Sequence, residues 1–358
     1  MKSPICEMLG IEFPLLAFSH CRDVVAAVSR AGGFGVLGAT AHSPASIHRE
    51  LAWIDENVGG KPYGLDVLIP ENMATAGETG VTYNSLKARV PAAHRAFAQS
   101  LLAQIGVENT EQANADDRPQ PFDPGEAMRV LEAAFQHPIR LIVNALGVPP
   151  PAMIEMGRAH GVPVAALVGA KEHALRQVAA GVDILVVQGT EAGGHCGEVT
   201  TLVLVPEVLK AIKPIRDVPV LAAGGIMNGA QMAACMAMGA AGAWTGSVWL
   251  ATAESETSEI FREKMIAATS RDAVRSRSRT GKPARQLRSA WTQAWEGDPA
   301  SPGALPMPLQ SLISEGALRS VDRAAAGGNA AARDMVTYFV GQGVGLIDCV
   351  RSAGQVVQ

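Results

Sequence analysis

The chain has 358 residues, and its 30 Lys and Arg against 34 Asp and Glu give a net charge of -4. This balance lacks the basic excess of proteins that bind nucleic acid. Hydrophobic residues make up 48% of the chain, which excludes disorder over most of its length. The five cysteines form no C-x-x-C pair and no apolar signal segment precedes Glu7. We therefore predict a reduced, cytoplasmic protein without a metal site.

Short runs rich in Val, Ile and Leu recur along the chain, each followed by a segment compatible with a helix. This alternation predicts βα units around a parallel sheet, and runs such as 184–187 are apolar on both faces, as buried parallel strands are. The eight predicted strands are 14–18, 33–37, 63–69, 140–146, 162–168, 183–188, 218–223 and 241–247. Eight such units within about 250 residues predict an α/β fold of the (β/α)8 TIM-barrel type. A doubly wound sheet is the alternative.

The connection 70–138 after the third strand is an insertion. Within it, 83–105 has helical periodicity, whereas 108–124 is polar, rich in proline, and predicted to be a surface loop. Since the insertion leaves the C-terminal end of a strand, which is the catalytic face of a TIM barrel, we predict that it forms a lid. We assign 1–254 to the barrel and 255–358 to a helical C-terminal segment packed on it.

The segment 218–253 contains no Asp, Glu, Lys or Arg, and its length would allow it to cross a bilayer. Glycines interrupt every apolar run in it before about 18 residues are reached, so we predict no membrane span. A basic run at 271–279 has two explanations. It grips a phosphate or acidic substrate, or it is a solvated surface stretch, which we favour.

A glycine-rich stretch, 188–197, directly follows the sixth predicted strand. Glycines let backbone N–H groups approach a ligand at the C-terminal rim of the sheet. Gln188 can donate and accept hydrogen bonds, as recognition of a polar heterocycle requires. His195 is a candidate catalytic base or donor, and a loop histidine bonded to backbone is the alternative. Cys196 has no basic partner beside it and is predicted to pack rather than react.

Small residues also end the seventh and eighth predicted strands, at Gly224, Gly225 and Gly246. In a TIM barrel, the loops at this position often bind phosphate through backbone N–H groups. Thr245 or Ser247 can add a hydroxyl donor. Without a Walker motif, the predicted ligand is one terminal phosphate of a cofactor. The alternative is that these small residues serve barrel packing alone.

Taken together, these motifs resemble the nitronate monooxygenase family, formerly called 2-nitropropane dioxygenases. The resemblance rests on 9–14, 27–35, 188–195, 223–226, 245–247, 280–285 and 340–342, and covers nearly the whole chain apart from 70–138. It implies an FMN-dependent barrel. The residues it places at the flavin are Ala17, Phe18, Asp66, Gln188, Gly193, Gly194, Gly224, Gly225, Trp244, Thr245, Gly246 and Ser247.

Three departures from the family pattern affect this interpretation. Asp66 stands where the family has a flavin- or phosphate-facing Asn, and a carboxylate cannot donate as an amide does. Ala145 replaces the His that many bacterial members carry at the end of strand four. The stretch 18–22 differs from the usual Pro-Met-Ala-Gly and offers His20 or Arg22 to an anion.

The resemblance implies FMN-dependent oxidation of alkyl nitronates with O2, giving a carbonyl product and nitrite. Without the strand-four His, we expect nitronates to be better substrates than nitroalkanes, which need a base. An NAD(P)H-dependent flavin reductase acting on a quinone or enoyl thioester is the second hypothesis, and a non-catalytic flavin-binding protein is the third. The predicted partners are a small-molecule substrate and O2, without nucleic acid or membrane. The sequence specifies neither the physiological substrate nor the oligomeric state.

Overall fold

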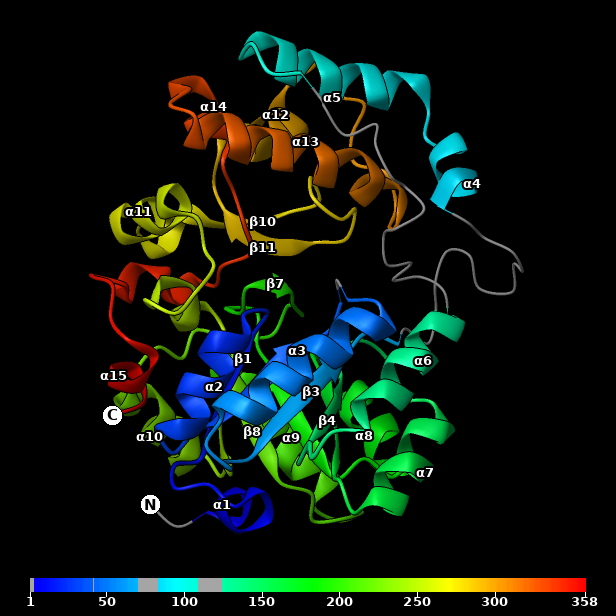
Figure 1. The fold of residues 1–358 in the computed structure, drawn as a ribbon, viewed down its shortest axis with the longest axis vertical. Helices are drawn as coiled ribbons and strands as arrows, with labels where there is room; N and C mark the ends of the chain where they lie inside the picture. Colours follow the sequence, from blue (N-terminus) through cyan, green and yellow to red (C-terminus); the bar gives the residue numbers. More distant parts are fainter. Residues whose placement is uncertain (1–2, 41, 70–82, 109–123) are drawn as a thin grey trace.

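The computed structural model describes residues 3–40, 42–69, 83–108 and 124–358 (Figure 1). Eight parallel strands close into a barrel in the order β1-β2-β3-β4-β5-β6-β8-β9. They are β1 Leu15–Ser19, β2 Phe34–Gly38, β3 Tyr63–Val67, β4 Ile142–Asn144, β5 Val164–Val168, β6 Ile184–Gln188, β8 Val220–Ala223 and β9 Gly242–Thr245. Each lies within one residue of the predicted run or inside it. The TIM-barrel prediction is confirmed, and the doubly wound alternative is excluded by closure of β9 onto β1.

Helices cover the outside of the barrel and alternate with its strands (Figure 1). They are α2 Arg22–Arg30, α3 Pro44–Asn57, α6 Pro124–Ala134, α7 Pro151–His160, α8 Lys171–Ala180, α9 Thr201–Ile212 and α10 Gly229–Ala237. A short helix, α1 Pro4–Leu9, closes the N-terminal end, where Ile5 and Leu9 join the cluster inside the barrel. Because this end is filled, access from outside is left to the C-terminal ends of the strands.

The lumen is a packed core over most of its depth. Side chains alternate along each strand, so that Leu65 and Val67 pack outward against helices while Phe34, Val36 and Val143 fill the lumen. The charge-free segment 218–253 forms β8, α10, β9 and the 3-10 helix η2 Ser247–Ala251. Its prediction as barrel wall is confirmed. In the described part of the chain, no helix is long and apolar enough to cross a membrane.

A second layer of elements lies over the C-terminal end of the barrel (Figure 1). Its helices are α4 Tyr83–Ala88, α5 Ala92–Gln104, α11 Glu259–Ala267, α12 Ala290–Gly297, α13 Leu309–Ala326 and α14 Ala330–Met335. All of these helices except α4 share one apolar cluster, in which Phe97 of the insertion meets Trp295 edge-on at a ring-centroid distance of 5.0 Å. Helix α15 Ala353–Val357 returns to pack on α2. The predicted helical region 83–105 is confirmed, whereas most of the predicted loop 108–124 lies outside the described residues and the lid stays a prediction.

The upper layer also contains strands, which the expected helical segment did not include. β10 Ala273–Ser276 and β11 Ala284–Leu287 pair antiparallel, and β7 Gly194–His195 adds to β11. β7 belongs to the loop after β6, so this small sheet joins the upper layer to the rim of the barrel. The polar segment between β6 and α9 therefore begins at the barrel wall and is paired, through β7, with β11 of the upper layer.

Neither explanation of the basic run 271–279 describes Arg279. Its side chain is 8% exposed and forms a two-pronged ion pair with Glu315 of α13, with both N–O distances at 3.0 Å. It also donates to the Thr337 carbonyl and lies 4.9 Å from the centre of the Tyr338 ring. Arg279 follows β10 and is buried against α13, so the run is neither a solvated stretch nor a phosphate grip at this position.

We expect Arg279→Ala to lower the free energy of unfolding by about 3 kcal/mol, because it leaves the Glu315 carboxylate without its partner in a largely dry site. Urea unfolding followed by circular dichroism measures the change. Arg351→Ala is the matched control, since Arg351 pairs with Asp348 on the surface, at 53% and 72% exposure. Equal stability of the two variants would contradict a structural role for the Arg279 pair.

Candidate functional site

The top layer of the lumen is where the barrel wall becomes polar. By alternation from Val186 and Gly64, Gln188 and Asp66 point into the lumen at the ends of β6 and β3. Phe18 and Trp244 face them from β1 and β9, with their rings stacked at a centroid distance of 6.1 Å. The Gln188 amide has no hydrogen-bond partner among the described residues. Aromatic walls with two unpaired polar groups suit a flat, polar heterocycle.

Backbone N–H groups without acceptors gather beside this layer. In the described part of the chain, the N–H groups of Gly224, Gly225 and Gly246 donate to no protein atom. Gly224 and Gly225 have φ of +111° and +69°, which favour glycine, and a Cβ on Gly246 would enter open space. Half-buried N–H groups need an acceptor. A phosphate supplies several, so the residues present fit a phosphate-bearing ligand.

The loops that carry these N–H groups are fixed by side chains behind them. Glu191 accepts hydrogen bonds from the Thr201 backbone N–H and lies 3.0 Å from its hydroxyl, at the N-terminus of α9. The same hydroxyl lies 3.1 Å from the Ala223 carbonyl oxygen. The Gln231 side chain stabilises the turn after β8, because its amide donates to the Gly225 carbonyl and accepts from the Met227 backbone N–H. The N–H groups of Gly224, Gly225 and Gly246, which we call the cradle, are therefore held in place before any ligand binds.

The C-terminal segment closes the same loops from above. The Gln342 N–H donates to the Glu191 carbonyl, and the Gly341 N–H donates to the Ser247 hydroxyl oxygen, both at 2.8 Å. A Cβ on Gly193 would lie 2.9 Å from the Gly341 nitrogen, so the two chains touch backbone to backbone. The motif at 340–342 was visible in the sequence, but its contact with the loops after β6 and β9 was not.

Two predicted hydroxyl donors differ in availability. Thr245 points away from the lumen, where its hydroxyl lies 3.2 Å from the Leu16 carbonyl and accepts from the Trp249 indole. Ser247 keeps its hydroxyl hydrogen, because it acts as acceptor toward Gly341. Ala17 likewise packs its side chain outward, so only its backbone borders the site. Of the two candidates, Ser247 is the one that the geometry leaves available.

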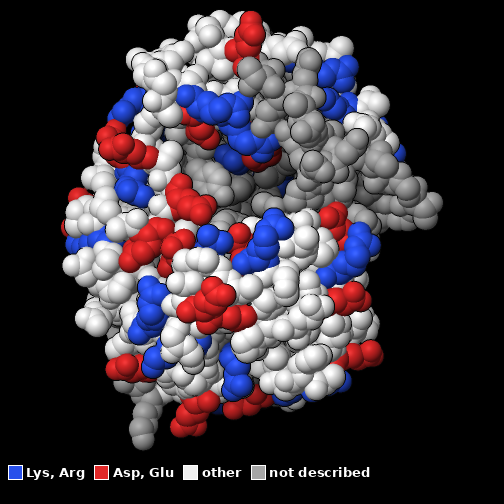
Figure 2. Space-filling model, viewed as in Figure 1, with Lys and Arg blue, Asp and Glu red and all other residues white. Residues whose placement is uncertain are grey.

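His195 lies in β7, opposite Ala284 of β11. Its Nε2 is 2.8 Å from the Thr280 hydroxyl, which itself donates to the Lys282 carbonyl at 3.2 Å. Nε2 therefore carries the hydrogen, and Nδ1 is left as an acceptor. The residue has exposed surface, yet burial among protein atoms, followed by the charge of Lys282, lowers its pKa to about 4. The ring is therefore exposed at the surface although protein atoms surround much of it. A recess separates the barrel from the upper helices in Figure 2.

His20 has a similar setting at the end of β1. Its Nδ1 donates to the Gly38 carbonyl at 3.1 Å, and its ring meets Phe18 edge-on at 5.1 Å. Burial lowers its pKa, so it is neutral near pH 7. His20 is thus a polar but uncharged group at this rim. Arg22, the other candidate from this stretch, pairs with Glu50 and stacks on Trp53 instead.

Lys282 is a functional candidate that the sequence interpretation did not select. It is exposed and has no acidic partner among the described residues. Its neighbours are otherwise engaged: Arg285 is buried and donates to the carbonyls of Thr190 and Ala273, and Arg275 pairs with Glu198. The sequence feature that could have indicated Lys282 is the glycine-containing turn at 280–283, in which Gly281 adopts φ +86°. An unpaired cation beside a neutral histidine suits an anionic substrate.

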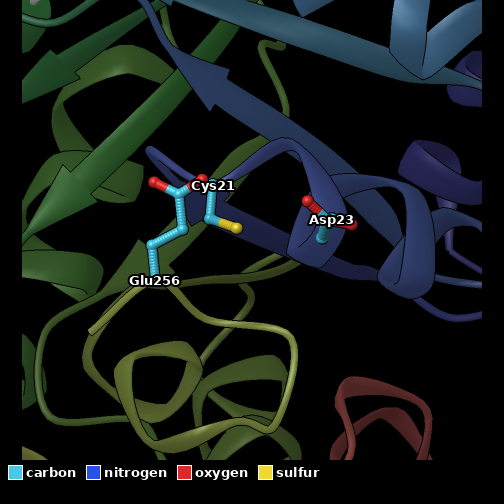
Figure 3. Close-up of side chains that lie close together, drawn as sticks. All are labelled: Cys21, Asp23 and Glu256. Atoms are coloured by element: carbon cyan, nitrogen blue, oxygen red, sulfur yellow. The ribbon is translucent and has the colours of Figure 1, made fainter. Parts of the chain in front are cut away.

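Burial raises the pKa of both thiols near the site, although Arg285 and Arg275 beside Cys196 act in the opposite direction. Burial raises the pKa of Cys196, whose thiol donates to the Thr190 carbonyl at 3.4 Å. Cys21 lies near Asp23 and Glu256, with one ligand atom of each within 4.8 Å of the others (Figure 3). Burial raises its pKa too, and its thiol donates to the Glu254 carbonyl at 3.1 Å. We assign no metal to this group.

We expect the His195 imidazole to titrate near pH 4, and the Lys282→Met substitution to raise that midpoint because it removes a neighbouring positive charge. Since the folded pKa lies below that of an unfolded His, this residue's contribution to stability falls as pH drops from about 6.5 toward 4. Titration of the ring resonances by NMR measures both. A wild-type midpoint near 6.5 would contradict burial of this ring.

Three comparisons bear on this chain. A model of the family described as "Nitronate monooxygenase" matches residues 2–358. A protein of Mycobacterium tuberculosis, "Putative monooxygenase Rv1533", is 53% identical over all of this chain and 95% of its own length. A "Probable nitronate monooxygenase" of Staphylococcus saprophyticus is 26% identical over 80% of this chain and 79% of its own. The structure of a nitroalkane oxidase from Streptomyces ansochromogenes shares the fold, with a TM-score of 0.74, 24% identity, and coverage of 99% of this chain and 95% of its own.

Proposed function

Since the chain belongs to the nitronate monooxygenase family, whose members are flavoproteins, we propose that it is an FMN-dependent enzyme that oxidises alkyl nitronates with O2 to a carbonyl product and nitrite. The observation that carries the cofactor part is the set of unpaired N–H groups at Gly224, Gly225 and Gly246. A single terminal phosphate is the ligand that such a cradle fits.

The residues that would hold FMN lie at the C-terminal ends of four strands, β1, β6, β8 and β9, or in the loops that follow them. Gly224, Gly225, Gly246 and Ser247 would bind the phosphate through N–H groups and one hydroxyl. Phe18, Trp244, Gln188, Gly193 and Gly194 would border the ring system, with the backbone of Ala17 behind Phe18. The bound flavin supplies the redox chemistry, accepting electrons from the substrate and passing them to O2. The chain itself supplies binding, orientation and charge.

Lys282 and His195 would position the substrate. A nitronate is an anion, so the unpaired ammonium of Lys282 would attract it to the mouth of the barrel. His195 presents Nδ1 as a proton acceptor, but with its pKa near 4 it is a weak base at pH 7. By alternation from Val143, Ala145 faces the lumen at the end of β4 and brings no base either. The site therefore favours nitronates, which need no proton removal, over neutral nitroalkanes.

Anaerobic mixing of the FMN-loaded enzyme with propionate 3-nitronate, NADH or NADPH tests the proposal, with the visible flavin spectrum as readout. We expect nitronate to bleach the flavin and NAD(P)H to leave it oxidised. The Lys282→Met variant should raise KM for the nitronate about tenfold with little change in kcat, because the lost interaction acts on binding. Lys213→Met is the control, because Lys213 is exposed at the C-terminal end of α9, away from the strand ends that border the site.

Two outcomes would contradict the proposal. Reduction by NAD(P)H alone would assign the enzyme to flavin reductases acting on a quinone or enoyl thioester. Inertness toward all three reagents would leave a non-catalytic flavin-binding protein. His195→Asn separates positioning from catalysis: unchanged turnover with retained FMN would remove His195 from the reaction.

A further inference from the structure

The acidic side chain of Asp66 lies in the lumen and has no hydrogen-bond or ion-pair partner among the residues that the structure describes. Asp66 is two residues after Gly64, whose missing Cβ would touch Phe34 and Leu141 inside the barrel, so Asp66 points into the same lumen one layer higher. The strand register places it between Gly38 of β2 and Val143 of β4. It is therefore in the layer that borders the proposed flavin site.

The surroundings of this carboxyl group offer no compensation for a negative charge. Asp66 is 4% exposed, and its buried Oδ1 has no hydrogen-bond partner. Gly38 contributes no side chain and Val143 is apolar. His20, which follows β1, packs over Gly38 of β2; it is neutral and donates to the Gly38 carbonyl. Helices α2, α3 and α6 cover the opposite face of β3, behind Leu65 and Val67.

Burial without a nearby cation raises the pKa of Asp66 well above its usual range. Desolvation is the cause of the shift. In its protonated form the group is a neutral carboxylic acid, with one O–H donor and one carbonyl acceptor. That pair of functions matches a carboxamide. As long as Asp66 keeps its proton, it can therefore donate and accept hydrogen bonds as the Asn expected at this position would.

We propose that Asp66 is a carboxylic acid that donates a hydrogen bond to the bound flavin, and that loss of its proton weakens flavin binding. This inference rests on the proposed function. An oxygen that is buried, unpartnered and directed into the cofactor layer needs a partner, and a ligand acceptor provides one. The ionised form cannot donate, and it would set a second negative charge beside a phosphate-bearing ligand. Asp66 thus couples cofactor retention to pH.

The sign follows from proton linkage. Flavin binds the protonated form, so affinity is full at low pH and falls as pH rises through the pKa of Asp66, by at most about tenfold per pH unit. The stability of the flavin-free protein against unfolding should fall with rising pH as well, because the folded state holds a proton on Asp66 that the unfolded state releases.

Fluorescence titration of flavin-free protein with FMN, from pH 5.5 to 9.5, tests the proposal in the wild type, Asp66→Asn and Asp23→Asn. Ionisation of the FMN phosphate affects all three equally. We expect the wild type and Asp23→Asn, whose changed residue is on the outer surface of α2, to lose FMN affinity with rising pH. Asp66→Asn should bind with an affinity that no longer falls, at least tenfold tighter than the wild type at pH 9.5.

A parallel loss of affinity in the wild type and Asp66→Asn would overturn the proposal. If Asp66→Asn does not fold, infrared spectroscopy of the flavin-free wild type decides: a protonated carboxyl band that persists well above the titration range of ordinary carboxyl groups supports the proposal, and its absence there overturns the proposal. Failure of every variant to bind FMN at any pH would instead refute the proposed function. The two failures are therefore distinguishable.

Discussion

Half-buried backbone N–H groups without acceptors are the feature on which the site depends. Such groups cost free energy comparable to a lost hydrogen bond unless a ligand or water accepts from them. This chain gathers them at Gly224, Gly225 and Gly246, where two strands of the barrel end side by side. Closure of the barrel brings the ends together, and Glu191, Thr201 and Gln231 hold the turns in place. The unsatisfied donors are thus held ready for an anion.

This arrangement explains why segment 218–253 contains no charged side chains. Its strands form part of the barrel wall, and its glycines would bind the phosphate through backbone N–H groups in the proposed site. Cationic side chains come from the upper layer, where Lys282 has no acidic partner among the described residues and Arg279 pairs with Glu315. In the proposed function, the neutral glycine loops would hold the cofactor and Lys282 would attract the substrate.

The sequence predicted the strands and the glycine-rich loops because both are local patterns. Apolar runs bounded by Gly or Pro identified every strand of the barrel, and the turns after β6, β8 and β9 followed from their glycines. The pairing of Arg279 with Glu315, the role of the turn that carries Lys282, and the outward direction of Thr245 depend on contacts between distant segments. Asp66 is the clearest case, since only the lumen around it shows that its carboxyl group is buried and has an oxygen without a hydrogen-bond partner among the described residues.

The central claim is that backbone N–H groups at the ends of β8 and β9 bind the phosphate of the flavin. Amide NMR of the flavin-free protein, titrated in parallel with FMN and with riboflavin, tests it most directly. The account predicts that FMN shifts the amide protons of Gly224, Gly225 and Gly246 downfield, and that riboflavin, which lacks the phosphate, does not. Equal shifts with both ligands, or FMN-induced shifts confined to other parts of the chain, would contradict it.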